Sequence, residues 1–486
     1  MSADPTRQLS RLERLKAAAT APIDPASLVA FRVVVGILTL IGAMRFLLNG
    51  WVERFFVKPT FFFKFWGFEW VEILPPAGMT AVFVAIVVLS ALVITGHLYR
   101  LAVVALFVLF TYVELLDVTN YLNHYYLVSL LLLLMCFLPL GDFGVLGQQT
   151  KEDIPSPTAP AWMVWLLRFQ VSVVYFYAGM AKATGDWLVH AQPMNIWLRA
   201  RTELPIIGQF LDHWNVALGM SWGGFLYDTT IAAFLLYRRT RPLAYVAVVG
   251  FHLTVGLLFN IGMFPFIMIG AALIFFEPDW PRRVLRIFGV GQKATASGAG
   301  QPASAKTPHI PARSPHRLPG QIALVAIALY MTFQVVMPMR FVFYGDNVLW
   351  HEQGMRWSWR VMVREKNGSV HYRVTLPETG KTRYVYPSRY LTDHQEREMS
   401  GQPDLILQLG QHIGREFQAK GHKRVEVRVN AQASLNGRSP RPLIDPEIDL
   451  MTLEDGLSVA GWILPAPTDK PIRLRPRRNT AQRQSR

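Results

Sequence analysis

The stretch AWMVWLLRFQVSVVYFYAGM, residues 161–180, and the Lys182 that closely follows it decide the fold class. The stretch is apolar and long enough to cross a hydrocarbon core of ~30 Å. Helical steps back from Lys182 place small and polar side chains on one face and apolar side chains on the opposite face. Ionisable groups in spanning helices cost about 2.5–3.5 kcal/mol each, so they tend to line a cavity or a pathway. A lysine that reaches toward the headgroups from a helix end is the alternative interpretation.

The composition extends this interpretation to the whole chain. With 51% hydrophobic and 17% charged residues, the sequence predicts a polytopic membrane protein with a soluble part attached. The net charge of +16 comes from short loops and from the final segment PIRLRPRRNTAQRQSR, with no interleaved aromatic platform, so we expect no nucleic-acid partner. The basic N-terminus lacks the apolar core and cleavage site of a signal peptide. The single Cys136 excludes an intrachain disulfide and is expected to pack in an apolar core.

Apolar runs recur along the chain and predict about nine membrane spans. They lie near residues 27–47, 77–96, 101–117, 122–141, 161–182, 219–237, 243–260, 262–277 and 318–338. Between the first two runs, residues 51–74 mix Phe and Trp with charged residues, which suits a segment in the membrane interface. Arginines in the loops at 238–241 and 281–317 indicate that these loops share the cytoplasmic side with the N-terminus. Nine crossings then place the C-terminal domain outside.

The fold class is therefore predicted as mainly α, with a helical membrane domain and a small extracytoplasmic α+β or β-rich domain. Alternating apolar and polar residues predict strands, and residues 392–420 are expected to be helical. The predicted strands are MRWSWRVMV (355–363), HYRVTL (371–376), TRYVYP (382–387) and RVEVRVNAQASL (424–435). The expected organisation is a cytoplasmic segment 1–25, a membrane domain 26–280, a flexible linker 281–317, a last membrane helix 318–339, a soluble domain 340–466 and a disordered basic tail 467–486.

Polar groups recur at the outward ends of the predicted spans. Asp117, Asn120 and His124 share one face if the helix is continuous there. The second group is the Lys182 face, and the third is His252 followed by the stretch 259–264. A lysine removed from water can lose its proton near neutral pH and act as a base. The aromatic surroundings suit a lipid-soluble substrate.

Asp228, inside the sixth predicted span, is a further buried ionisable candidate. One interpretation pairs it with Arg168, so that both charges can be buried. Metal binding is not expected, because the histidines are scattered and no HExxH spacing occurs. Neither a Gly-rich phosphate loop nor a GxSxG motif appears, which argues against nucleotide binding and serine hydrolysis.

Several strings of the sequence match one family. They are DPASLVAFRVVVG (24–36), NHYYL (123–127), LRFQVSVVYFYAGMAKATGDW (167–187), GGFLYD (223–228), FHLTVGLLFNIGMFPF (251–266), RWSWRV (356–361) and LIDPEIDL (443–450). With these strings the chain resembles the vitamin K-dependent gamma-glutamyl carboxylases, whose membrane part belongs to the horizontally transferred transmembrane (HTTM) domains. The AGxxKxxxDW and FH…LFxIGMF patterns are specific, whereas DPASLxxFR is common to the broader family.

The resemblance implies a mechanism and a set of site residues. In that family a lysine at the position of Lys182 deprotonates reduced vitamin K, whose reaction with O₂ yields a strong base and leaves the epoxide. That base removes a γ-proton from glutamate, and CO₂ adds to the carbanion. The resemblance implies that His124 stabilises the charged intermediate. It also implies that Asn123 lies beside His124 and that His252 and the stretch Phe259–Phe264 line the quinone and glutamate site. Together with the residues singled out by their positions in the predicted spans, the expected quinol- or substrate-binding residues are Asn123, Arg168, Tyr175, Asp228, His252, Phe259, Met263 and Phe264.

The implied cofactor is a menaquinol-type reduced vitamin K, with O₂ and CO₂ as co-substrates and no metal. The implied partners are a glutamate-containing protein or peptide and the lipid bilayer; no oligomeric state is predicted. Animal members carry a disulfide that the lone Cys136 excludes, and their soluble domain is longer. The composition and the short loops suggest a bacterial inner-membrane protein with its C-terminal domain in the periplasm.

Two other functions compete with carboxylation. One is a quinol epoxidase or oxidase that does not carboxylate protein. The other is a non-catalytic quinone- or lipid-binding protein in which Lys182 only contacts a polar head. Carboxylation predicts that Glu peptides stimulate epoxide formation. The uncoupled enzyme predicts epoxide without that stimulation, and the binding protein predicts no product.

Overall fold

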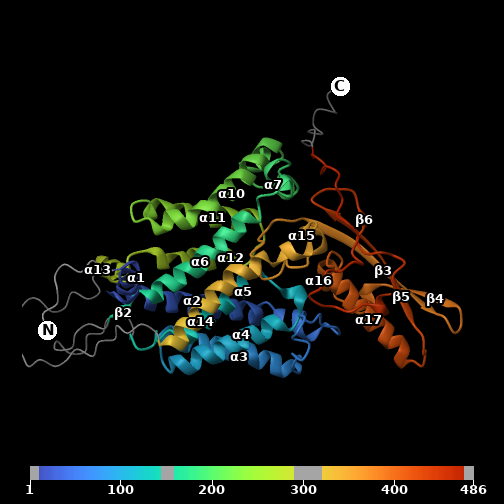
Figure 1. Cartoon of the computed structure of the whole chain (residues 1–486), viewed down its shortest axis with the longest axis horizontal. Coiled ribbons are helices and arrows are strands. Elements are labelled where there is room, and N and C mark those ends of the chain that lie inside the picture. The colour runs from blue at the N-terminus through green and yellow to red at the C-terminus, as the bar shows by residue number, and fades with distance from the viewer. Residues whose placement is uncertain (1–9, 144–157, 289–319, 475–486) are drawn as a thin grey trace, which may run out of the picture.

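The computed structural model describes residues 10–143, 158–288 and 320–474. An elongated bundle of apolar helices forms one end of the molecule and a sheet-containing domain forms the other (Figure 1). The main helices of the bundle are α2 (Ala26–Leu48), α3 (Pro76–Thr95), α4 (Tyr99–Leu115), α5 (Asn123–Phe137), α6 (Trp162–Met180), α10 (Trp214–Leu236), α11 (Arg241–Leu258), α12 (Phe264–Ala272) and α14 (Gln321–Val336). Each of the nine predicted apolar runs overlaps one of these helices.

Among the described residues, five helical segments are long and apolar enough to cross a membrane: α2, α3, α6, α11 and the segment Gln321–Tyr344. The last of these joins α14 to the 3-10 helix η4 (Met337–Tyr344). Helix α5 and the segment Phe264–Phe275, which joins α12 to η3 (Leu273–Phe275), are apolar but shorter. The chain is thus a multi-pass membrane protein, and the exact number of nine crossings stays a prediction.

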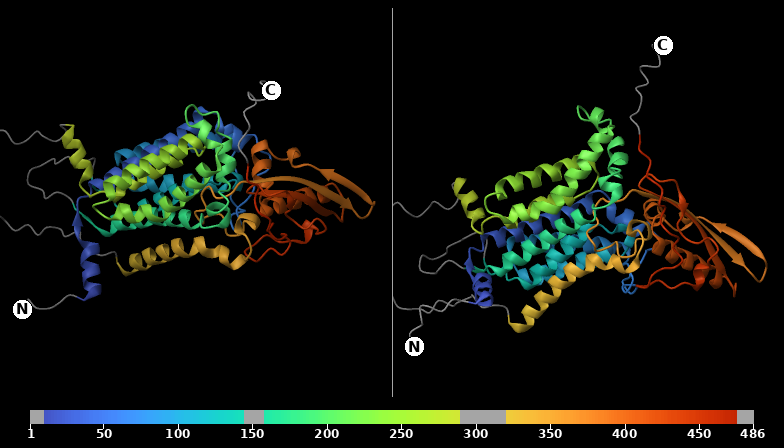
Figure 2. Two further views of the ribbon diagram at one scale, coloured as in Figure 1. Left: turned by 90° about the horizontal axis from the view of Figure 1, so that it is seen from above. Right: turned by 45° about the horizontal axis from the view of Figure 1, so that its top comes forward.

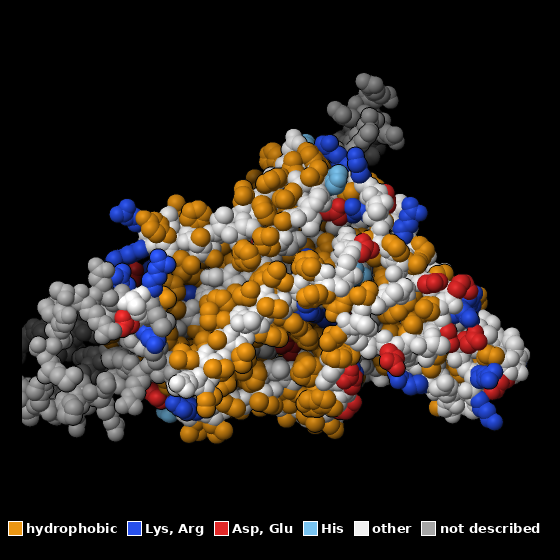
Figure 3. Space-filling model, in the orientation of Figure 1, with side chains coloured by type: hydrophobic (Ala, Val, Ile, Leu, Met, Phe, Trp, Pro, Cys, Tyr) orange, Lys and Arg blue, Asp and Glu red, His pale blue; other side chains and the backbone are white. Residues whose placement is uncertain are grey.

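Apolar side chains cover the helical bundle on the face shown in Figure 3, whereas charged side chains gather toward its two ends. This is the pattern expected for helices in contact with lipid. Helix α14 runs along the outside of the bundle (Figure 2). Short elements complete the membrane domain: α1 (Arg11–Thr20), β1 (Pro22–Ile23), η1 (Glu53–Val57), η2 (Val118–Asn120), β2 (Ala159–Pro160), α7 (Gly185–Leu188), α8 (Met194–Arg199), α9 (Gly208–Leu211) and α13 (Trp280–Ile287).

The C-terminal domain is built on a four-stranded antiparallel sheet in the order β4-β3-β5-β6. Helix α17 packs on this sheet, where the Tyr372 hydroxyl donates to the carbonyl of Ile406 at 2.9 Å. The elements are α15 (Val348–His351), β3 (Lys366–Leu376), β4 (Lys381–Val385), η5 (Pro387–Arg389), α16 (Asp393–Met399), α17 (Pro403–Ala419), β5 (Glu426–Leu435), β6 (Arg441–Pro442) and η6 (Leu450–Thr452). The predicted helix over 392–420 is confirmed as two helices.

The core of this domain continues into the membrane domain. Phe63 and Phe65, which lie in the predicted interfacial segment 51–74, are buried in the same apolar cluster as the sheet residues. Ala181, next to Lys182, belongs to that cluster as well. The domain is therefore held directly against the end of the bundle that carries Lys182.

Three predicted segments differ from the structure. Residues 355–363 do not form a strand, because Trp357, Trp359 and Met362 have φ angles of 58°, 58° and 51° and the segment turns repeatedly. The predicted linker begins with the helix α13, and its residues 289–317 lie outside the described part of the chain. The first residues of the predicted tail are ordered, since the carbonyl of Ile472 accepts from the Gln192 amide at 2.9 Å. Residues 475–486 lie outside the described part.

Candidate active site

Lys182 lies just beyond the C-terminal end of α6 and forms a buried ion pair with Asp228 of α10. The Nζ atom is 2.8 Å from Asp228 Oδ2, and only 5% of Lys182 and 6% of Asp228 are exposed. Nζ also donates to the carbonyls of Ala178 at 3.0 Å and Val361 at 3.4 Å. A buried ion pair persists only when further hydrogen bonds satisfy its remaining polar atoms, and the two carbonyls supply these. The predicted pairing of Asp228 with Arg168 is therefore wrong.

The DW of the AGxxKxxxDW string fixes the surroundings of the lysine. The Lys182 ammonium lies 5.4 Å from the centre of the Trp187 ring, in the range of a cation–π contact. The Trp187 indole N–H donates to the carbonyl of Ser221 on α10 at 2.7 Å. Asp186 accepts two hydrogen bonds of 2.7 Å from Arg438 in the C-terminal domain. Trp187 thus packs beside the lysine, and Asp186 holds the C-terminal domain next to it.

Close contact between α6 and α10 at Gly179 allows the ion pair to form. A Cβ atom at this position would lie 2.6 Å from Thr229 Cγ2 and 2.8 Å from the Thr229 backbone nitrogen. We therefore expect Gly179→Ala to push the two helices apart, lower the stability by about 1–3 kcal/mol and displace Lys182 from Asp228. Thermal unfolding in detergent measures the loss. Gly223→Ala on α10, where no atom lies within 4 Å of the added Cβ, is the control and should leave the midpoint unchanged or raise it.

A narrow and mostly apolar cavity opens beside the ion pair. It is lined by Val174, Tyr175, Ala178, Lys182, Trp187, Met194, Trp197, Met220, Gly224, Asp228, Phe251, His252, Val255, Phe259, Phe264, Met268, Val361 and Met362. We call it the lysine cavity. Six of the residues singled out in the sequence meet here: Tyr175, Lys182, Asp228, His252, Phe259 and Phe264.

His252 contributes a polar edge to the lysine cavity. Its Nε2 lies 3.2 Å from the Tyr175 hydroxyl, and the residue is 1% exposed. Its Nδ1 is buried and has no hydrogen-bond partner among the described residues. A buried polar atom without a partner is costly, so this nitrogen is suited to a polar group of a bound molecule.

His124 is buried behind the wall of the lysine cavity rather than on its lining. Its ring centre lies 6.0 Å from that of Phe264 and 4.6 Å from that of Tyr125. Tyr125 and Met263 line a second apolar cavity on the other side. Asp117, Asn120 and His124 were expected to share one face only if the helix is continuous, and it is not: a 3-10 turn separates α4 from α5, and Asp117 caps this turn by accepting from the Thr119 amide at 2.9 Å.

Arg168 does not line the lysine cavity. It donates to the carbonyls of Ile274, Phe275 and Phe276 at 3.0, 3.2 and 3.0 Å. These carbonyls end the helical segment that contains η3, where a cation is favourable. The structure thus gives Arg168 a helix-capping role at the opposite end of α6 from Lys182.

A small polar cavity, which sequence reasoning missed, adjoins the lysine cavity. Its lining consists of Val118, Thr119, Tyr121, Asn123, Glu352, Met355, Arg356, Arg360, Met362, Val363, Arg364, Glu398 and Gln402. Met362 lines both cavities. We call this the arginine cavity. The signal that could have revealed it is the cluster of three arginines in RWSWRVMVR (356–364), two of which fall in the predicted strand 355–363.

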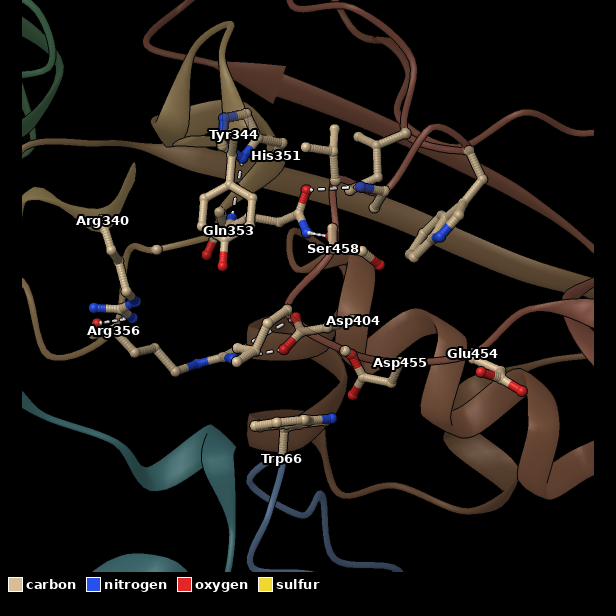
Figure 4. A pocket seen from close by; sticks show the side chains of 18 of the residues that line it. Trp66, Arg340, Tyr344, His351, Gln353, Arg356, Asp404, Glu454, Asp455 and Ser458 are labelled. Carbon is tan, nitrogen blue, oxygen red and sulfur yellow. Dashed lines mark hydrogen bonds and ion pairs between the residues drawn. The ribbon is translucent and has the colours of Figure 1, made fainter. Parts of the chain in front are cut away.

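A wider groove in the C-terminal domain adjoins the arginine cavity, and Glu352 and Arg356 line both. Figure 4 shows Arg356 directed at Asp404, with Nη–Oδ distances of 2.5 and 3.2 Å. Burial and the nearby Asp404 raise the pKa of Asp455 to about 6. Three spaces thus follow one another from the soluble domain to Lys182: the groove, the arginine cavity and the lysine cavity.

In the described ranges no group of three or more His, Cys, Asp or Glu side chains could hold a metal ion. Comparison with known families gives two matches. Residues 20–280 match the HTTM domain, and residues 319–469 match the lumenal domain of vitamin K-dependent gamma-carboxylase. No solved structure matches the chain.

Proposed function

The chain belongs to the vitamin K-dependent gamma-carboxylase family, and from this premise we propose that it carboxylates glutamate side chains at the expense of a reduced naphthoquinone. The observation that carries the proposal is the buried Lys182–Asp228 pair at the edge of an apolar, aromatic cavity. The proposed substrate is a glutamate-containing protein or peptide, and the proposed setting is a bacterial inner membrane in which menaquinol is the available quinol.

The lysine cavity suits a flat apolar ring with a polar substituent. Phe251, Phe259 and Phe264 supply aromatic walls, while the polar atoms available are Lys182 Nζ and the unpartnered His252 Nδ1. When bound, the reduced naphthoquinone would supply, through its oxygenation by O₂, the strong base needed at the γ-carbon of glutamate.

The chain's own contribution to the first step is proton transfer at Lys182 Nζ. Nζ can accept a proton only as a neutral amine. The ion pair provides that amine when the proton it shares moves to Asp228 Oδ2, 2.8 Å away. The carbonyls of Ala178 and Val361 hold Nζ in place, and burial excludes water that would otherwise quench a strong base. We propose that His124 acts on the charged intermediate from behind Phe264, and that Asn123 faces the glutamate.

We expect detergent-purified protein to form both products when given reduced menaquinone-4, O₂, radiolabelled bicarbonate and a Glu-containing peptide. Epoxide is followed by chromatography and label is counted in the peptide. A peptide with Gln in place of Glu is the matched control and should take up no label. Epoxide with no label, and no stimulation by the Glu peptide, would favour an uncoupled epoxidase. Quinol binding without either product would favour a binding protein.

A further inference from the structure

Arg360 is a buried cation that has no counter-charge among the described residues. The residue is only 9% exposed, and its buried Nε has no hydrogen-bond partner in the described part of the chain. Among the described residues, no carboxylate forms an ion pair with its guanidinium. The guanidinium lies over the Phe341 ring, whose centre is 4.1 Å from Cζ. Burial and the nearby Arg340 lower the pKa of Arg360 to about 10, so the side chain remains charged at neutral pH.

Other buried or half-buried arginines in the described part of the chain have partners. Arg356 binds Asp404, Arg438 binds Asp186 and Arg241 binds Glu277, and Arg168 has its three carbonyls. Burying an unpaired charge carries a large desolvation penalty and destabilises the folded state. A position that keeps such a charge is therefore expected to meet an anion that is absent from the free chain. Arg364, which lines the same cavity, pairs with Glu352, a carboxylate that Lys366 also contacts at 3.1 Å.

The place of Arg360 relates this anion to the proposed reaction. Its side chain lines the arginine cavity, and its own carbonyl accepts a long 3.5 Å hydrogen bond from the Asn123 amide. The next residue, Val361, lines the lysine cavity and offers its carbonyl to Lys182 Nζ. Arg360 thus directly precedes Val361, which contacts Lys182. Met362 lies between the two cavities, with Arg360 on the side of the arginine cavity.

We propose that Arg360 binds the γ-carboxylate of the substrate glutamate, which enters the arginine cavity from the groove of the C-terminal domain. The inference rests on the proposed function, and Arg360 is a substrate-binding residue in it. A planar guanidinium can hold a carboxylate through two parallel hydrogen bonds, which fixes the position of the adjacent γ-carbon.

This contact also addresses the charge problem of the reaction. The γ C–H bond breaks, its proton goes to the base generated from the quinol, and the electron pair stays on a carbon beside a carboxylate. That pair then attacks the carbon of CO₂, so that a C–C bond forms and the product carries two carboxylates. Each stage adds negative charge next to the existing carboxylate, and a fixed cation at that point favours it.

The test compares Arg360→Gln and Arg360→Lys with Arg383→Gln, an exposed arginine of β4. Binding of the Glu peptide and of its Gln counterpart to the full chain is first measured without quinol, by saturation-transfer NMR. The KM for the Glu peptide is then measured in turnover. Loss of a charge-assisted contact of about 1.5–3 kcal/mol corresponds to a roughly 10- to 150-fold rise in KM for Arg360→Gln. Arg360→Lys should recover part of this, and Arg383→Gln should match the unmodified chain.

The outcomes separate this inference from the proposed function. Binding of the Glu peptide that Arg360→Gln abolishes, with no label in any variant, would support the inference and contradict carboxylation. Carboxylation with an unchanged KM in Arg360→Gln would overturn the inference and leave the function standing. Loss of a co-purified anionic lipid in native mass spectrometry, with peptide binding intact, would assign the arginine to a headgroup phosphate and also overturn it. A chain that binds neither peptide would contradict both.

Discussion

Replacing Lys182 with alanine is expected to abolish both epoxide formation and peptide carboxylation, and to destabilise the protein. The loss of stability follows from Asp228, which is left as a buried carboxylate without a partner. Removing one member of a buried ion pair costs about 3–5 kcal/mol. Inactivity of the single variant alone would therefore not distinguish a lost base from a damaged fold.

The double variant Lys182→Ala with Asp228→Asn separates these two effects. It removes both charges, so we expect the thermal midpoint to return most of the way toward that of the unmodified chain, while both products stay absent. Thermal unfolding in detergent and the two-product assay provide the measurements. Recovery of epoxide formation in the stabilised double variant would show that Lys182 is not the base.

Asp186→Ala is expected to loosen the C-terminal domain from the membrane domain and to cost about 3 kcal/mol, because it leaves Arg438 largely buried without its carboxylate. Asp186 also accepts from the Asn436 amide at 2.9 Å, so three hydrogen bonds are lost. Hydrogen exchange should show faster exchange in β5 and in the segment 355–363. The exchanged pair Asp186→Arg with Arg438→Asp is the control and should restore part of the protection.

The same contact predicts a pH dependence. Burial would raise the pKa of Asp186, but hydrogen bonds from Arg438 and Asn436 outweigh it and lower the pKa below its usual value. A carboxyl whose pKa is lowered by folding stabilises the fold above the pKa it has when unfolded, about 4. The stability difference between the unmodified chain and Asp186→Ala should thus be complete at pH 7 and shrink as the pH falls below about 4. A constant difference down to pH 3 would contradict this.

The sequence predicted the helical bundle well because apolarity and length alone determine which segments can be helices in lipid. It could not predict which charges would meet. Arg168 and Asp228 looked like partners, but Lys182 lies fourteen positions after Arg168, and a helical rise of ~1.5 Å per residue separates the two by roughly 20 Å. Asp228 packs at the level of Lys182, as the Gly179–Thr229 contact requires.

The contacts that complete the site were out of reach for a different reason. Asp186 meets Arg438 from another domain, and no local pattern reports a pairing over such a sequence separation. The arginine cavity was missed because alternating Trp and Arg in 356–360 imitate a strand. Packing at the domain boundary instead holds Trp357 and Trp359 at positive φ, a backbone conformation that propensity disfavours. Tertiary contacts override the local preference there.

The short segment from Arg360 to Met362 belongs to both cavities, and this has a thermodynamic consequence. A ligand that shifts this segment from one side alters the position of the Val361 carbonyl, and hence the hydrogen bond to Lys182 on the other side. Two binding sites that share a movable element are linked, and linkage is reciprocal. Whatever factor a bound peptide applies to the affinity for quinol, bound quinol must apply to the affinity for peptide. Binding of each substrate would then change the affinity for the other before the chemical reaction begins.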